Sequence, residues 1–303
     1  MADRNAFQTA VDHLVPGGGR VLDIAPVSGG CISQASRVVV DTGNATPRTW
    51  FVKSNEADFM ENFRCESEGL RRIADTGAIR VPVPIATGEA DGRAWLVIDW
   101  VETRRAERDF FPAFGEQLAA LHRSTHGAAI GLDHDNFLGS ARQPNRATDS
   151  WVEFVAVRRL GFQLRWGVDN GRIDNTLRQS VEELIRRLPE VLKGRDEPTS
   201  LLHGDLWSGN YLTAGDGQPV LIDPAIYRGC REAEFGMLRL FGNCPESFYQ
   251  AYLTAWPLPD GWQRRTQVYV LYHLLNHLNL FGGSYADSCH RTAAEILRGQ
   301  STP

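Results

Sequence analysis

Short apolar runs separated by glycine, proline and asparagine dominate the first third of the chain, a pattern that predicts β-strands. The predicted strands cover residues 20–26, 36–41, 50–53 and 94–98. Apolar residues recur at helical spacing over residues 58–75 and predict one helix between the third and fourth strands. Residues 81–84, Val-Pro-Val-Pro, are expected to be extended because each proline disfavours helix in the residue before it.

The pattern becomes helical after residue 104. Phe110, Phe114, Leu118 and Leu121 recur at helical spacing, and the capping-box pair Ser150 and Glu153 predicts the start of another helix. Further helices are predicted at residues 176–192, 247–255, 263–281 and 285–298, with one strand-like interruption between residues 201 and 223.

These elements predict an α+β protein with two lobes. An N-terminal antiparallel β-sheet lobe with one helix is expected over residues 1–98, where nucleotide would bind. A larger, mainly helical lobe with catalytic and substrate-binding residues is expected over residues 104–303, and residues 99–103 form the predicted hinge.

Composition narrows the possible functions only slightly. The 303 residues, 42% of them hydrophobic and 23% charged, are typical of a globular protein with one large or two coupled domains. A net charge of −5 gives no broad attraction to nucleic acid or to an anionic membrane. No apolar run suits a signal peptide or a membrane span, and the five scattered cysteines match neither a zinc site nor a disulfide framework. The expected location is therefore the cytoplasm.

The most informative segment is His203-Gly-Asp-Leu-Trp-Ser-Gly-Asn210, followed by a predicted hairpin that ends near Asp223. If residues 211–213 pair with residues 220–222, Asn210 and Asp223 lie side by side, because hairpin partners are about 4.5–5.5 Å apart. Asp205 lies on the loop that leads into the same end of the hairpin. Carboxylate and amide oxygens are the ligands that Mg²⁺ prefers. Phosphoryl transfer uses this set, with one Asp to accept a hydroxyl proton and an Asn and an Asp to hold metal on the phosphates.

A purely structural interpretation is that His203-Gly-Asp forms a turn and that Asp223 caps a strand. Without a metal, however, two carboxylates about 4 Å apart would repel each other by roughly 4 kcal/mol at an effective dielectric constant near 20. The order Asp-x₄-Asn…Asp is also the order found in kinases. The combination therefore favours a phosphotransferase.

Two features upstream complete this set. Residues 27–34, Val-Ser-Gly-Gly-Cys-Ile-Ser-Gln, lie between two predicted strands, where glycines would let backbone N–H groups approach phosphate oxygens. This segment lacks the GxGxxG spacing, and taken alone it favours a plain hairpin turn. Lys53 at a strand end is either an edge charge or an anchor for phosphates. Glu66 is its expected ion-pair partner, chosen over Glu61 and Glu68 partly through the resemblance described next.

Together these residues resemble the fructosamine/ketosamine-3-kinase family, relatives of aminoglycoside phosphotransferases and choline kinases. The resemblance covers nearly the whole chain and is carried by Gly29-Gly-Cys-Ile-Ser33, Phe51-Val-Lys53, Asp135-Asn-Phe-Leu-Gly139, the segment from His203 to Asn210, Asp223-Pro-Ala-x-Tyr-x-Gly-x-Arg-Glu232, and the segment from Leu271 to Gly282. It implies a protein-kinase-like fold, ATP and Mg²⁺ as cosubstrates, and phosphorylation of the 3-hydroxyl of fructosamine- or ribulosamine-type adducts. Because such products fall apart, the implied outcome is deglycation of small ketosamines or of glycated protein lysines.

The resemblance also implies a role for each matching residue. Asp205 is the expected catalytic base, Asn210 and Asp223 the metal ligands, Lys53 the phosphate anchor and Glu66 the group that orients Lys53. The other expected nucleotide-binding residues are Gly29, Gly30, Cys31 and Ile32 in the phosphate loop, and Asp99, Trp100 and Val101 in a hinge whose backbone meets adenine. The glycine run is shorter than in some relatives.

Several side chains keep two interpretations. Trp207 either packs between elements or forms a wall against the open-chain sugar, and Asn210 is also a candidate substrate contact. His273 and His277 are more typical of a packed helix face than of a zinc site, because no glutamate follows the first histidine. Cys31, surrounded by glycines, is hypothesised to be redox-sensitive.

Two other functions stay open. A kinase for an aminoglycoside, choline or another hydroxylated metabolite would share the catalytic residues but not residues 135–139 or 271–282. A catalytically dead pseudokinase that binds nucleotide or a partner would be expected to lack a catalytic residue, yet all are present. No sequence pattern predicts the oligomeric state.

Overall fold

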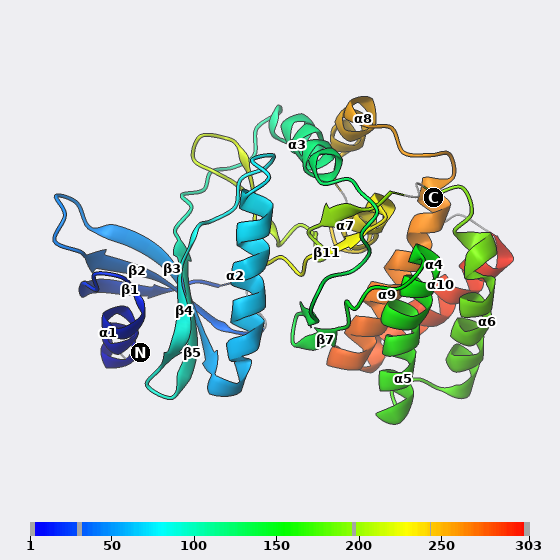
Figure 1. Ribbon diagram of the computed structural model, residues 1–303, viewed down its shortest axis with the longest axis horizontal. Coiled ribbons are helices and arrows are strands. Elements are labelled where there is room, and N and C mark those ends of the chain that lie inside the picture. Colours follow the sequence, from blue (N-terminus) through cyan, green and yellow to red (C-terminus); the bar gives the residue numbers. More distant parts are fainter. Residues whose placement is uncertain (1–3, 29–31, 196–197, 243, 300–303) are drawn as a thin grey trace. The chain divides into compact units, whose positions relative to one another are not determined.

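The computed structural model describes residues 4–28, 32–195, 198–242 and 244–299. Contacts within the chain define two compact units, residues 1–110 with 209–224 and residues 111–208 with 225–303 (Figure 1). The sequence analysis expected one boundary, at residues 99–103, with all later residues in the second lobe. In the structure, residues 209–224 group with the first unit. The mixed α+β architecture is as predicted.

The first unit is built on a five-stranded antiparallel sheet in the order β1-β2-β3-β5-β4. The strands are β1 (Arg20–Pro26), β2 (Gln34–Asp41), β3 (Arg48–Glu56), β4 (Pro84–Ala90) and β5 (Arg93–Asp99). In β2, buried and partly exposed residues alternate, as a sheet with one covered face requires. All four strands predicted from the apolar runs are present, and β4 is an additional edge strand.

Two helices cover this sheet, not the one that was predicted. After the short 3₁₀ turn η1 (Ala57–Phe59), α2 (Met60–Ala74) matches the predicted helix, whereas α1 (Arg4–Leu14) was not expected. The buried residues of α1 include Phe7, whose ring meets Trp95 edge to face with centroids 5.0 Å apart. The helix α1 spans only eleven residues, and its buried face has just four residues, Ala6, Phe7, Ala10 and Val11, so its helical signal is weak.

A two-stranded hairpin, β9 (Tyr211–Thr213) and β10 (Pro219–Leu221), also belongs to the first unit. Its partners are Tyr211 with Leu221 and Thr213 with Pro219, so the predicted register was wrong by one residue. The reason is the turn: Ala214 N–H donates to Gln218 O at 2.9 Å, which leaves Pro219 in the strand.

The second unit is mainly helical. Its helices are α3 (Phe110–Ser124), α4 (Trp151–Phe154), the π-helix η2 (Val155–Leu160), α5 (Gly161–Asp169), α6 (Asn175–Val191), η3 (Arg231–Ala233), α7 (Glu234–Leu240), α8 (Glu246–Ala255), α9 (Trp262–Phe281), η4 (Gly283–Tyr285) and α10 (Ala286–Arg298). Buried residues lie on all sides of α9, which makes it the central helix of this core. The long predicted helices are present with ends shifted by a few residues at most.

Two short strand pairs complete the second unit, β6 (Asn136–Leu138) with β7 (Ala141–Gln143), and β8 (Ser200–Leu202) with β11 (Tyr227–Gly229). The predicted capping box is present in modified form: Ser150 Oγ accepts from Glu153 N–H at 3.1 Å, and Glu153 Oε2 accepts from Asp149 N–H. Within the described residues, no helix is both long enough and apolar enough to cross a membrane.

Candidate active site

A buried ammonium between two carboxylates is the main polar feature of the first unit. Lys53 Nζ on β3 lies 2.8 Å from Glu66 Oε1 on α2 and 2.8 Å from Asp223 Oδ1, beyond the hairpin. The Lys53 side chain is 10% exposed, so both ion pairs are shielded from water on its side. Three residues that the sequence analysis assigned to nucleotide and metal binding are therefore in direct contact.

The charges in this cluster shift one another's proton affinity. Burial alone would lower the pKa of Lys53, but the charge of Asp223, followed by that of Glu66, holds this pKa above its ordinary value. Burial raises the pKa of Glu66 to about 7; Lys53 opposes this rise and Asp223 adds to it. Lys53 is therefore firmly charged, whereas Glu66 changes charge near neutral pH.

Asp223 and Asn210 lie at the same end of the hairpin. Asn210 is buried, and its carbonyl accepts a hydrogen bond from Ile222 N–H at 3.0 Å, so Asp223 lies one residue beyond the position opposite Asn210. Asp223 has a left-handed backbone with φ of +55°, which costs a non-glycine residue on the order of 1 kcal/mol. This backbone turns the chain where the carboxylate meets Lys53.

The chemistry of these donors fits Mg²⁺. The amide oxygen of Asn210 and the carboxylate of Asp223 are hard ligands, and Mg²⁺ commonly takes one or two protein groups and completes its octahedron with phosphate and water. Among the described residues, no group of three or more His, Cys, Asp or Glu side chains could hold a metal by itself. The set therefore suits a cation that arrives with phosphates better than a resident metal.

The predicted hinge residues follow the end of β5. Asp99 is its last residue, the ring of Trp100 stacks on that of Phe51 with centroids 6.3 Å apart, and Val101 is buried in a small apolar cluster with Ala214. Within the described part of the chain, the backbone N–H of Val101 donates no hydrogen bond. An unpaired backbone donor beside an apolar cluster suits a flat heterocycle, and the adenine role stays a prediction.

Part of the predicted phosphate loop lies outside the described residues. Gly29, Gly30 and Cys31 lie outside the described residues, and with them the hypothesis of a redox-sensitive thiol. Ile32 is exposed, and its carbonyl accepts a hydrogen bond from Asn55 Nδ2 at 3.1 Å. The other four cysteines are buried and free of disulfides.

The segment with the predicted base belongs to the second unit, directly after β8. Gly204 has φ of +82°, and a Cβ at this position would lie 2.1 Å from the carbonyl oxygen of Ala225. Only glycine therefore fits between His203 and Asp205. The imidazole of His203 is fully buried, and its Nδ1 accepts from the backbone N–H of Asp205 at 3.3 Å.

A buried carboxylate holds this segment, and the sequence analysis missed it. Glu234, the first residue of α7, accepts hydrogen bonds from the N–H groups of His203 at 2.6 Å and Gly204 at 3.1 Å. Its other neighbour is His122 Nε2 at 3.4 Å, and His122 Nδ1 contacts the hydroxyl of Tyr252 at 2.8 Å. A glutamate directly before the apolar run Phe-Gly-Met-Leu was the available signal.

These partners keep Glu234 ionised despite its surroundings. Burial alone would raise the pKa of Glu234, but the hydrogen bond with His122 and the backbone donors outweigh it, and the net pKa is lowered. Burial lowers the pKa of His122, against the pull of Glu234. A buried anion that accepts two consecutive backbone N–H groups therefore fixes the residues just before Asp205.

The family-like segment at residues 135–139 has a structural role. Asn136 Nδ2 donates to Ile226 O at 2.7 Å, and Gln143 Nε2 donates to Ala225 O at 3.0 Å. This hairpin thus supports the backbone that packs against Gly204.

Trp207 is the first ring in a series of aromatic contacts that leads to His277. Trp207 meets Phe241 edge to face at 6.2 Å, and Phe241 lies 4.9 Å from the ring of His277. His277 Nδ1 contacts the carbonyl of His273, and burial lowers the pKa of His273 to about 3. This is the packed helix face expected for the two histidines, whereas the substrate role of Trp207 stays a prediction.

Comparison with known proteins settles the family. A family model described as fructosamine kinase matches residues 8–299. The chain belongs to the fructosamine kinase family. A protein named probable ketoamine kinase from Synechocystis sp. is 39% identical over 279 residues, which are 92% of this chain and 92% of that protein. A chloroplastic protein-ribulosamine 3-kinase of Oryza sativa subsp. indica is 36% identical, covering 92% of this chain and 80% of its own.

Solved structures agree with this fructosamine kinase fold. A crystal structure assigned to a fructosamine-3-kinase from Thermobifida fusca has a TM-score of 0.84 at 31% identity, covering 97% of this chain and 99% of that one. An aminoglycoside phosphotransferase has a TM-score of 0.65 at 17% identity, which shows a shared kinase-like fold alone. The resemblance read from the motifs and the predicted kinase-like fold are confirmed. The roles of single residues stay predictions.

Proposed function

We propose that this protein is an ATP- and Mg²⁺-dependent ketosamine 3-kinase that phosphorylates the 3-hydroxyl of fructosamine- or ribulosamine-type adducts. The observation that carries the proposal is the fructosamine kinase match over residues 8–299, which includes all the candidate catalytic residues. The contacts of Lys53 with Glu66 and Asp223 support the phosphotransferase chemistry.

In the proposed reaction, Lys53 binds the nucleotide phosphates and Glu66 keeps its ammonium oriented. Asn210 and Asp223 would hold Mg²⁺, which, when bound, neutralises charge on the phosphates. Asp205 accepts the proton of the 3-hydroxyl as that oxygen bonds to the γ-phosphorus and the bond to ADP breaks. Glu234 would act as a positioning residue because it holds the backbone just before Asp205.

The product explains the proposed outcome. After a proton moves from C1 to give the C1–C2 enaminol, phosphate leaves C3 with the C–O bonding electrons, and water hydrolyses the resulting imine at C1, which frees the amine, inorganic phosphate and a deoxy dicarbonyl sugar. The proposed consequence is repair of glycated amines, whether small metabolites or protein lysines.

The test is Mg²⁺-dependent ATP consumption with ribuloselysine and with fructoselysine, using Asp205→Asn as the control. Turnover of either sugar that is lost in the variant would support the proposal and rank the sugars. Absence of turnover with both, while Mg·ATP still binds, would contradict the ketosamine assignment. A panel of aminoglycosides and choline would then test the wider kinase class.

A further inference from the structure

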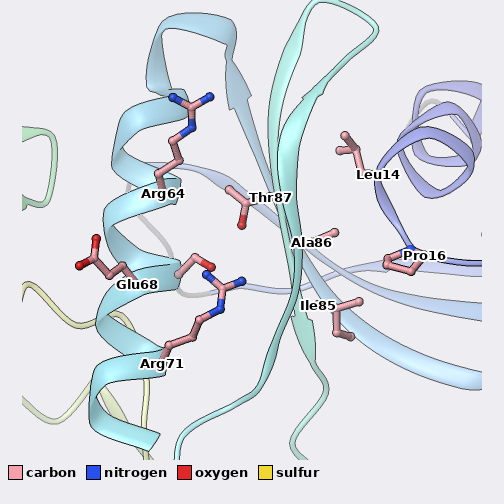
Figure 2. A pocket seen from close by; sticks show the side chains of 9 residues that line it. Leu14, Pro16, Arg64, Glu68, Arg71, Ile85, Ala86 and Thr87 are labelled. Carbon is pink, nitrogen blue, oxygen red and sulfur yellow. The ribbon is translucent and has the colours of Figure 1, made fainter. Parts of the chain in front are cut away.

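A groove of about 480 Å³ lies at the edge of the sheet in the first unit. Figure 2 shows that its walls come from α2, from the edge strand β4 and from the end of α1. None of its lining residues belongs to the cluster around Lys53. The volume falls within the range of small-molecule sites.

One face of α2 supplies most of the polar lining. Arg64, Ser67, Glu68 and Arg71 are spaced three, four and seven residues apart, which places them on the same side of the helix. In Figure 2, Arg71 extends from α2 toward β4, which carries Thr87. Arg64 lies farther along the same helix face.

Some polar side chains that line this groove already have a partner, and others have none. Glu68 pairs with Arg72, and Arg64 pairs with Glu61. By contrast, the exposed Arg71 makes no ion pair or hydrogen bond through its guanidinium with any described residue. Ser67 Oγ and Thr87 Oγ1 are both buried without a partner, and the Ser67 residue is only 1% exposed.

Unpaired groups of this kind indicate what they would bind. A guanidinium presents a planar fork of N–H donors that matches phosphate or carboxylate, and serine and threonine hydroxyls add single donors. The one carboxylate in the described lining, Glu68, is already paired with Arg72. Leu14, Ile85 and Ala86 form an apolar wall, which in Figure 2 lies on the α1 side of β4, across this edge strand from Thr87 and Arg71.

We propose that this groove binds the oxyanion group, phosphate or carboxylate, of a small metabolite whose apolar part lies on that wall. Arg71 supplies the charge and the main hydrogen bonds, and Ser67 and Thr87 supply hydroxyl donors. The site is distinct from the proposed nucleotide site but shares a helix with Glu66, which directly precedes Ser67.

The test uses inorganic phosphate, phenyl phosphate and benzoate as probes, followed by NMR through the backbone amides of residues 64–71 and 84–90. We expect saturable shifts with at least one probe. Arg71→Gln should weaken binding about tenfold, the loss of a charge-assisted hydrogen bond. Ser67→Ala and Thr87→Val should weaken it several-fold, while the exposed Arg48→Gln should leave it unchanged.

The relative affinities of phenyl phosphate and benzoate then identify the preferred oxyanion. Lys53→Met separates this groove from the proposed nucleotide site, since binding in the groove should persist in that variant. The proposal is overturned if no probe shifts these amides, if Arg71→Gln binds as the wild type does, or if Lys53→Met abolishes binding. Because no turnover is measured, failure here is distinguishable from failure of the kinase assay.

Discussion

Two groups of candidate residues, one in each unit, are stabilised in opposite ways. In the first unit, charges hold Lys53, Glu66 and Asp223 together, and the Asp223 side chain is 41% exposed. In the second unit, a fully buried Glu234 holds the backbone before Asp205 through hydrogen bonds. A charge cluster with one member exposed to solvent can rearrange when a proton or a cation arrives, whereas a satisfied buried network stays rigid. The comparison indicates that the cluster around Lys53 responds to its surroundings, whereas the loop before Asp205 is preset.

The largest expected effect comes from Asp205, on the loop of the second unit. Asp205→Asn should lower kcat by about 10²–10⁴-fold, the usual contribution of a positioned base, and leave ADP affinity nearly unchanged. Steady-state phosphorylation and calorimetric ADP binding measure the two quantities. Asp216→Asn, a change in the exposed hairpin turn, is the matched control. An Asp205→Asn enzyme with nearly wild-type kcat would remove Asp205 from the mechanism.

Glu234→Gln should have the second-largest effect. Replacing the buried anion weakens its charge-assisted hydrogen bonds to two backbone N–H groups, so the free energy of unfolding should fall by about 3 kcal/mol. We also expect kcat per folded molecule to fall about tenfold, with little change in KM for ATP.

Glu232→Gln is a suitable control because it breaks another buried ion pair, with Arg265 at 2.6 Å, without touching the loop. It should destabilise the protein and spare kcat. Equal losses of kcat in both variants would mean that Glu234 acts only through stability.

The steady-state rate should depend moderately on pH through the cluster of Lys53, Glu66 and Asp223. Because its pKa is raised to about 7, Glu66 is protonated below that pH and its ion pair with Lys53 weakens. The raised pKa also means that the contribution of Glu66 to folding stability is greatest below its ordinary pKa and is lost as pH rises through about 7.

We expect kcat/KM for ATP to rise several-fold with pH around 7, and Glu66→Gln to remove that inflection. The midpoint should move to lower pH with Mg·ADP bound, because a cation at Asp223 cancels the charge that helps to raise the pKa of Glu66. Glu61→Gln on the same helix should keep the wild-type profile. Identical profiles for all three proteins would contradict the assignment.

The smallest expected effect concerns Trp207. If its ring contacts the sugar, Trp207→Ala should raise KM for the ketosamine about fivefold, equivalent to roughly 1 kcal/mol, with KM for ATP unchanged. Trp166→Ala, which removes another partly exposed ring of the second unit, should not alter either KM. Lost stability with an unchanged sugar KM would leave Trp207 with a packing role only.

Much of the fold could be predicted because several helices carry strong periodic patterns, as in α2, α6 and α10, and because α9 is a long, mainly apolar segment. The helix α1 could not be predicted, because its buried face is short and its packing against Trp95 is visible only in the folded chain. The hairpin register depended on a turn that closes at Gln218, and nothing in the local pattern excluded closure one residue later. Glu234 was missed because its partner His203 is 31 residues away, so only the folded chain shows the contact.

The buried state of Lys53 has a consequence for the chemical durability of the protein. The chain contains two lysines, Lys53 and Lys193, against thirty arginines. Reducing sugars attack neutral amines, and the pKa of Lys53, which burial alone would lower, is held up by Asp223 and Glu66, so almost none of this amine is neutral. An enzyme proposed to remove sugar from lysines thus offers few lysines of its own, and Lys53, its proposed phosphate anchor, is kept protonated and largely buried.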